Sequence, residues 1–296
     1  MKTIHCILHG GKKKSKKLQI FLANCQTVFG ASFHLSETIA PMHAAEIAKN
    51  IEEDIILIIG GDGTVNEVIN GWVSNKNGPK IAIIPYGTGN DFTRGIQANI
   101  TMDNFIDTLL NPQLIEVDVP FVKYDEEIRY FVNICDIGFG GEVVRKLTQY
   151  RRCFGTRFSY GLAILRTFIF HRNKKVKIDI GDKIIEGEIL LLAFCNGPMF
   201  ADGLIVQPDA KVNDQLLHHS FFKNVTLIDY LINLSKVKRG IKLTHPEVEY
   251  GKNLDYSISS PKIIYGECDG ELISGNTFKI GLSAHKFNLI TASLKN

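Results

Sequence analysis

The chain has 296 residues, of which 45% are hydrophobic and 22% are charged, and its formal net charge is +3 at pH 7. This length and composition are ordinary for a globular protein with a large core, in one domain or two. The small net charge, without a basic stripe of interleaved aromatic residues, argues against nucleic-acid binding.

Strand and helix patterns alternate along residues 1–110, as in a layered α/β domain. A lysine-rich loop leads into a first helix, and Pro41 starts a second one, predicted over residues 41–53. Apolar runs predict three strands, at residues 4–8, 55–59 and 81–84. The second and third are typical of buried parallel strands.

The second predicted strand runs into a glycine-rich turn, which reads Gly60-Gly61-Asp62-Gly63-Thr64-Val65-Asn66. Glycines let a ligand approach the backbone closely, and the free amides of a helix N-terminus attract anions. We expect a helix to begin at Thr64, with Thr64 and Glu67 forming a capping box. We interpret the turn as a phosphate site, and a simple strand-to-helix turn is the alternative.

A second glycine turn follows the strand at residues 81–84 and reads Pro85-Tyr86-Gly87-Thr88-Gly89-Asn90-Asp91. The Thr88 hydroxyl could bond a phosphate or a ribose, and Asn90 and Asp91 could cap a short helix. A plain turn explains these residues equally well when they are taken alone. Since open α/β sheets place their sites at the carboxyl edge of the strands, the two turns together predict one nucleotide site.

Beyond about residue 114, short strand candidates follow one another between turn residues, as in an all-β sandwich. Helices interrupt them at residues 158–170 and around 226–239; the first is typical of a core helix but could admit an acyl chain. The strand candidates are residues 114–122, 129–134, 175–180, 184–194, 203–206, 216–222, 247–250, 255–258, 262–266, 271–273 and 277–282.

Two acidic segments of this second half are candidate sites. Glu267-Cys268-Asp269-Gly270-Glu271 places three carboxylates in five residues, and its Asp-Gly pair predicts a hairpin turn that could carry a catalytic base. The segment at residues 209–214 lies between two predicted strands. Its carboxylate and backbone oxygens could hold Mg²⁺, and a solvated loop is the alternative.

With these motifs the chain resembles the diacylglycerol kinase catalytic-domain family, and in particular the soluble bacterial lipid kinases related to diacylglycerol and sphingosine kinases. The resemblance rests on three segments and covers essentially the whole chain in order: Gly60 to Gly71, Pro85 to Phe92, and Asp269-Gly270-Glu271. It implies a three-layer, NAD-kinase-like α/β domain with a mostly parallel sheet, and a β-sandwich lipid domain. We expect these at residues 1–120 and 121–286, with the tail from about 287 to 296 returning to the first domain.

The resemblance implies an ATP-dependent lipid kinase that uses Mg²⁺ and binds ATP in the cleft between its domains. Asp62 would act near the phosphates, directly or through Mg²⁺, Glu271 would accept the proton of the lipid hydroxyl, and Asp269 would hold metal or water. A structural Mg²⁺ would bind the Lys211 carbonyl, Asp214 and the Leu216 carbonyl. The implied ATP contacts are Thr38, Gly60, Gly61, Asp62, Gly63, Thr64, Val65, Asn66 and Thr88.

The chain departs from the family pattern in three places. His9-Gly10-Gly11-Lys12 replaces an Asn-Pro-x-x-Gly pattern, which weakens the first phosphate contact. Asn213-Asp214-Gln215 replaces Asp-Asp-Gly, which argues against the structural Mg²⁺. Phe139-Gly140-Gly141 replaces Phe-Asp-Ala, which bears on substrate handling.

Three other interpretations stay open. NAD kinase shares the Gly-Gly-Asp-Gly turn, although the continuation from Asn66 to Gly71 favours the lipid branch. A catalytically weak nucleotide or lipid sensor and a ligand-free structural protein are the other two.

The sequence also bears on location and assembly. Single cysteines without CxxC spacing, no signal peptide and no membrane-spanning run favour the cytoplasm, with contact at a membrane surface left open. Dimers occur among similar proteins, so a homodimer stays open, and the sequence does not identify the lipid.

Overall fold

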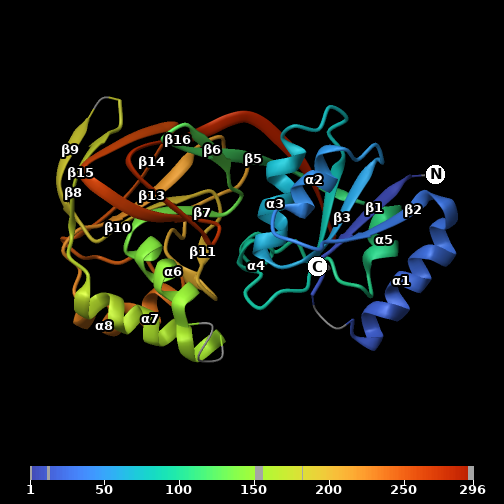
Figure 1. Ribbon diagram of the computed structural model, residues 1–296, viewed down its shortest axis with the longest axis horizontal. Helices are drawn as coiled ribbons and strands as arrows, with labels where there is room; N and C mark the ends of the chain where they lie inside the picture. Colours follow the sequence, from blue (N-terminus) through green and yellow to red (C-terminus); the bar gives the residue numbers. More distant parts are fainter. Residues whose placement is uncertain (1, 12–13, 151–155, 182, 293–296) are drawn as a thin grey trace. The chain divides into compact units, whose positions relative to one another are not determined.

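The computed structural model describes residues 2–11, 14–150, 156–181 and 183–292. The chain divides into two compact units, the first made of Met1–Val119 with Ala284–Asn296 and the second of Pro120–Ser283 (Figure 1). No helix within the described ranges is both long and apolar enough to cross a membrane.

The first unit is built on a parallel sheet whose strands follow the order β4-β3-β1-β2. The end of β16 (Glu271–Thr291) adds to β4 in parallel, with Leu289 beside Ile81. The three predicted strands are confirmed, whereas β2 was not predicted because this edge strand buries only its first residue. Their bounds are β1 (Ile4–Leu8), β2 (Phe33–Glu37), β3 (Ile55–Gly60) and β4 (Lys80–Pro85).

Helices cover both faces of this sheet, so the predicted three-layer α/β fold is confirmed (Figure 1). On one face Phe21 of α1 meets Phe105 of α5, with ring centroids 5.7 Å apart. On the other face Trp72 of α3 meets Phe287 of β16 at 5.8 Å. The helices are α1 (Lys16–Phe29), the 3-10 turn η1 (Gly30–Ser32), α2 (His43–Lys49), α3 (Asp62–Trp72), α4 (Asp91–Gly95) and α5 (Phe105–Leu110).

Two predicted helix starts were wrong. Helix α2 is shorter than residues 41–53, because Met42 has a left-handed backbone at φ 65° and Asn50 ends the helix. Helix α3 begins at Asp62 rather than Thr64, with Gly61 in the capping position. The predicted capping box is therefore absent, and the Glu67 carboxylate instead accepts a hydrogen bond from the Ala44 amide.

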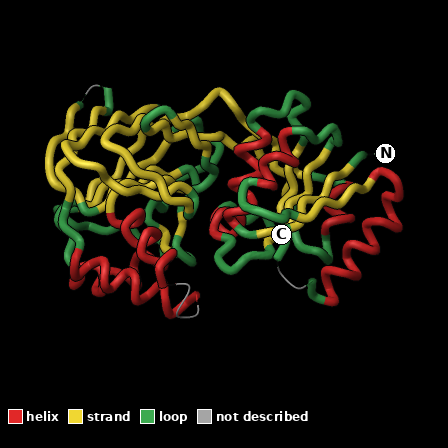
Figure 2. The backbone as a smooth tube through the Cα atoms, viewed as in Figure 1, coloured by secondary structure: helices red, strands yellow, loops and turns green. Residues whose placement is uncertain are grey.

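The second unit is a β-sandwich, as predicted, and Figure 2 shows its strands with helices on one side. One long hairpin, β15 with β16, joins the layers: the end of β15 pairs with β7, and its beginning pairs with β8. A register shift between Ser259 and Ile264 lets the hairpin bend. The remaining strands are β5 (Gln113–Tyr124), β6 (Glu127–Tyr130), β7 (Ile134–Gly138), β8 (Lys174–Asp179), β9 (Ile184–Ile189), β10 (Leu191–Cys195), β11 (Met199–Phe200), β12 (Leu204–Ile205), β13 (Leu217–Phe222), β14 (Val248–Asn253) and β15 (Asp255–Cys268).

Several predicted strand limits change for identifiable reasons. The run at 184–194 breaks at Leu190, whose amide points to the carbonyls of Phe222 and Lys223 where the chain passes from β9 to β10. The run at 129–134 breaks because the amides there bond a side chain of the β15–β16 hairpin. Helices α7 (Thr156–Phe170) and α8 (Leu227–Lys238) were predicted. Helix α6 (Phe139–Tyr150) was not predicted, because two glycines near its start lower its helix propensity.

Candidate active site

The loops at the carboxyl ends of four parallel strands lie side by side in the first unit. The His9 amide donates to the Ile59 carbonyl at 3.0 Å, and the Thr38 amide donates to the Leu8 carbonyl at 3.0 Å. The Tyr86 amide donates to the Gly60 carbonyl at 2.8 Å. The structure therefore brings Thr38 and both glycine turns to one edge of the sheet, where parallel α/β sheets place their ligands.

The two glycine turns pack directly against each other. A Cβ atom at Gly87 would lie 2.5 Å from the Gly61 Cα, and one at Gly60 would lie 2.6 Å from the Thr64 Cβ. Gly63 differs, because it is exposed and a Cβ there would meet nothing within 4 Å. A glycine inside a helix costs about 1 kcal/mol of stability relative to alanine, and no protein atom near Gly63 requires a glycine there. Close approach of a ligand to the backbone is therefore the best explanation for this glycine.

Asp62 links the two turns at the first position of α3. Its Oδ1 accepts a hydrogen bond from the Phe92 amide at 3.2 Å, and a Cβ at Gly89 would lie 3.2 Å from its Oδ2. The residue is half-buried, beside the N-terminus of α3. This carboxylate can neutralise a cation that accompanies an anionic ligand at the helix end.

The segment that departs from the family pattern has a defined role at this edge. The Gly10 amide donates to the Thr38 Oγ1 at 2.9 Å, and a Cβ at Gly10 would lie 1.8 Å from the Thr38 carbonyl oxygen. The His9 Nδ1 lies 3.3 Å from the Thr64 Oγ1. Residues 9–10 therefore hold the loops of β1, β2 and β3 together.

The other expected nucleotide contacts divide into exposed and buried residues. Thr88 is exposed at the tip of its turn. Val65 is 2% and Asn66 0% exposed, and the Val65 amide is used within the helix by the Gly61 carbonyl. Val65 and Asn66 thus shape the turn from inside and present no side chain to a ligand.

Gly87→Ala is expected to separate the two turns, because its Cβ would collide with the backbone of Gly61. Overpacking of this kind costs about 1–3 kcal/mol, and the displaced turn should weaken binding of the nucleotide that the resemblance implies at this edge. Denaturant unfolding and ATP titration check this result. Gly187→Ala is the matched control, since a Cβ there meets nothing within 4 Å, and equal behaviour of the two variants would contradict the prediction.

The hairpin between β15 and β16 carries the acidic motif of the second unit. The Asp269 carboxylate accepts hydrogen bonds from the amides of Val132, Asn133 and Ile134 at 2.8, 3.1 and 3.0 Å. The carboxylate that the resemblance assigned to metal or water thus accepts three backbone hydrogen bonds. Asp269 therefore positions the hairpin, whereas Glu271, two residues later, is exposed.

Two asparagines fix the loops beside this hairpin. The Asn133 carbonyl accepts the amides of Asn196 at 2.8 Å and Gly197 at 3.0 Å, and the Asn133 Nδ2 donates to the Met199 carbonyl at 2.8 Å. A Cβ at Gly197 would lie 2.2 Å from the Asn133 Oδ1. Gly197 is thus required by close packing next to the Asp269 turn.

A buried pair of carboxyl groups, Asp136 and Glu267, was missed by sequence reasoning. They face each other across β7 and β15 and are 0% and 5% exposed. Burial raises the pKa of Asp136 to about 7, and burial with the Asp136 charge raises the pKa of Glu267 well above its usual value. A Cβ at Gly140 would lie 1.9 Å from the Asp136 Oδ2, so the departure at Gly140 makes room for this carboxyl.

The Asp136–Glu267 pair predicts a pH dependence of stability. Because the pKa of Asp136 is raised on folding, its contribution is fully present below about pH 4 and is lost as the pH rises through about 7. Asp136→Asn should flatten the pH dependence of the unfolding free energy, so that its stability relative to the wild type rises by up to roughly 4 kcal/mol from pH 4 to 8. Urea unfolding at several pH values measures this, and parallel curves for the two proteins would exclude it.

The expected structural Mg²⁺ site does not fit the residues present. The Asp214 Oδ1 accepts the Leu216 amide at 3.2 Å, and its Oδ2 lies 2.9 Å from the His218 Nε2. Asp209 of the same loop forms an ion pair with Lys242. Both oxygens of Asp214 therefore have hydrogen-bond partners, one of them an imidazole nitrogen, whereas Mg²⁺ demands oxygen ligands in near-octahedral geometry.

Comparison with known proteins agrees with this arrangement. Residues 6–122 match the family described as the diacylglycerol kinase catalytic domain, and residues 134–288 match the YegS C-terminal NAD kinase beta sandwich-like domain. The chain is 30% identical to a diacylglycerol kinase of Staphylococcus epidermidis over 229 residues, which cover 77% of this chain and 71% of that protein. It is 27% identical to a diacylglycerol kinase of Bacillus subtilis over 232 residues, covering 77% and 75%.

The fold comparison covers nearly the whole chain. A crystal structure of a diacylglycerol kinase from Bacillus anthracis str. Sterne matches with a TM-score of 0.70 at 20% identity, over 99% of this chain and 97% of that one. This similarity supports the same two-part fold.

Proposed function

The chain belongs to the diacylglycerol kinase family of lipid kinases, and we propose that it transfers the γ-phosphoryl group of ATP to the hydroxyl of a diacylglycerol-like lipid. The observation that carries this proposal is the edge formed by two interlocked glycine turns, with exposed Gly63 and half-buried Asp62 at the start of α3. Amides at a helix N-terminus bind phosphate oxygens, and the adjacent carboxylate suits a cation bound to them.

In this proposal the turn from Gly60 to Thr64 holds the phosphates, with Thr38 and Thr88 as side-chain contacts. Mg²⁺ bound with ATP would neutralise phosphate charge, and Asp62 is the residue of this edge that would hold it. Glu271 accepts the hydroxyl proton, the lipid oxygen bonds to the γ-phosphorus, and the bond to the ADP oxygen breaks. Phosphoryl transfer depends mostly on such alignment and charge neutralisation.

Two helices of the second unit support a role at a membrane surface. Helix α8 has no buried residue and exposes Ile228, Leu231 and Ile232, at helical spacing on one face, by 67%, 59% and 68%. Lys236 and Lys238 follow in its last turn. In α7, Ile169 and Phe170 are 61% and 69% exposed, while the side chains of residues 156–162 lie outside the described residues. Exposed apolar and basic side chains together suit an anionic lipid surface.

The test is a phosphorylation assay with γ-labelled ATP and Mg²⁺. The protein is incubated with vesicles that contain diacylglycerol, phosphatidylglycerol, a sphingoid base or a ceramide, and separately with NAD. We expect one labelled lipid, with the diacylglycerol vesicles giving labelled phosphatidic acid.

Two outcomes would overturn the proposal. Labelled NADP without labelled lipid would make the protein an NAD kinase. ATP binding without a labelled product from any lipid class would make it a nucleotide or lipid sensor.

A further inference from the structure

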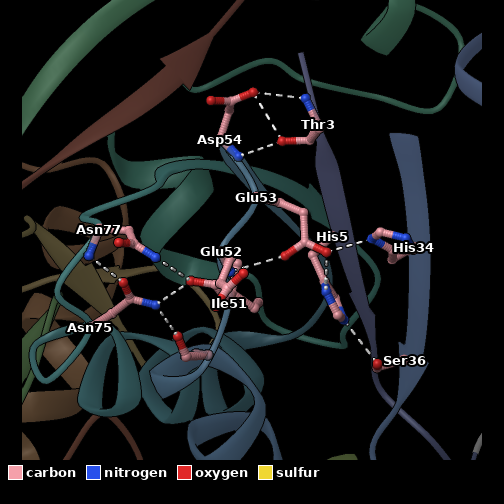
Figure 3. A network of polar contacts seen from close by, with 11 residues as sticks. Thr3, His5, His34, Ser36, Ile51, Glu52, Glu53, Asp54, Asn75 and Asn77 are labelled. Atoms are coloured by element: carbon pink, nitrogen blue, oxygen red, sulfur yellow. Dashed lines mark hydrogen bonds and ion pairs between the residues drawn. The ribbon is translucent and has the colours of Figure 1, made fainter. Parts of the chain in front are cut away.

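A cluster of two histidines and a glutamate lies in the first unit, away from the glycine turns. His5 and His34 occupy the second positions of β1 and β2, at the amino ends of these strands. The two residues are register partners on adjacent parallel strands, so their side chains leave the sheet on the same face. Figure 3 shows the carboxylate of Glu53, just before β3, directed toward both imidazoles.

The donor atoms of this cluster converge. The His5 Nδ1 lies 3.2 Å from the Glu53 Oε1, and the His34 Nδ1 contacts the same oxygen. One nitrogen or oxygen atom from each of the three residues lies within 4.8 Å of the others. Two ligands that bind a tetrahedral Zn²⁺ at 2.0–2.2 Å stand about 3.3 Å apart, so an ion requires only small movements. His34 can supply them, because its side chain is 56% exposed.

The other two ligands are already oriented. The His5 Nε2 lies 2.9 Å from the Ser36 Oγ, which directs the Nδ1 of the same ring toward Glu53. The Glu53 Oε2 accepts the Glu52 amide at 3.2 Å, and the side chains of His5 and Glu53 are only 17% and 14% exposed. An outer partner on the second ring nitrogen is typical of metal-binding histidines, because it fixes the ring and its tautomer.

We propose that His5, His34 and Glu53 form a binding site for a divalent transition metal, with Zn²⁺ as the ion that fits best. Two imidazole nitrogens and one carboxylate suit Zn²⁺, whereas Mg²⁺ and Ca²⁺ prefer oxygen ligands. Three protein ligands leave a coordination position for water. The bound ion would link the edge strand β2 to the segment that leads into β3. This metal site is separate from the proposed nucleotide site.

The experiment uses the full chain, freed of metal by EDTA that is then removed. Co²⁺ is added as a spectroscopic probe, and Zn²⁺ is added in a thermal melt. We expect about one equivalent of Co²⁺ to give visible d–d absorption that Zn²⁺ abolishes, and Zn²⁺ to raise the melting temperature.

Variants separate this site from other surface histidines. His34→Gln changes an exposed side chain, so its melting temperature in EDTA should equal that of the wild type, while its affinity for Co²⁺ falls by at least roughly 10-fold. Glu53→Gln should show the same loss. His285→Gln, an exposed histidine of β16 in the same unit, should bind as the wild type does. Absence of binding by the wild type, or equal binding by all three variants, would overturn the proposal.

Discussion

Glu271→Gln is expected to lose turnover by about 10²- to 10⁴-fold while its affinity for ATP stays unchanged, because a general base contributes that much to proton transfer. The amide keeps the size of the side chain but cannot accept the proton of the lipid hydroxyl at neutral pH. The residue is exposed at the start of β16, so the substitution should not alter the fold. Initial rates with labelled ATP, together with calorimetric ATP binding, measure the two effects.

Glu126→Gln is the matched control, since Glu126 is an exposed glutamate in the turn between β5 and β6 of the same unit. Its rate should equal that of the wild type. Full activity of Glu271→Gln would remove Glu271 from the role of base, and loss of ATP binding in that variant would point to a structural effect.

Asp62→Asn should lower kcat by about 10²- to 10³-fold and weaken Mg²⁺-dependent ATP binding, because it removes a preorganised charge beside the phosphates. The fold should survive, since the side-chain oxygen of the introduced asparagine can still accept the Phe92 amide as Asp62 does. ATP titrations with and without Mg²⁺ resolve the two contributions. Asp107→Asn, a change in the first turn of α5, serves as the control. An unchanged response to Mg²⁺ in Asp62→Asn would count against this site.

The sequence predicted the parts of the fold whose signals are local. Continuous apolar runs marked β1, β3 and β4, and the glycine turns after β3 and β4 marked the edge where they meet. Helix α6 was not predicted, because Gly140 and Gly141 weaken helix propensity. Glycine is needed at Gly141 because residues distant in the sequence pack closely against it. A Cβ at Gly141 would lie 2.4 Å from the Gly266 amide nitrogen, a contact that no local pattern reveals.

The candidate site was predictable in its motifs but not in the partners of its side chains. The resemblance implied that Asp269 holds metal or water, and only the fold shows that three amides of residues 132–134 donate hydrogen bonds to its carboxylate. Asp214, expected to bind Mg²⁺, contacts His218, and the contact between Asp136 and Glu267 across two strands was not predicted at all. His5, His34 and Glu53 are far apart in the chain; strand register pairs the two histidines, and the segment before β3 brings Glu53 to them.

A crystal structure with a non-hydrolysable ATP analogue, Mg²⁺ and a diacylglycerol analogue tests the central claim most directly. We predict that the triphosphate lies on the amides of the Gly60–Thr64 turn and that Asp62 faces its metal ion. The Glu271 carboxylate should lie within about 2.6–3.2 Å of the acceptor hydroxyl. A triphosphate bound elsewhere, or a Glu271 that points away from the acceptor in this complex, would contradict the account.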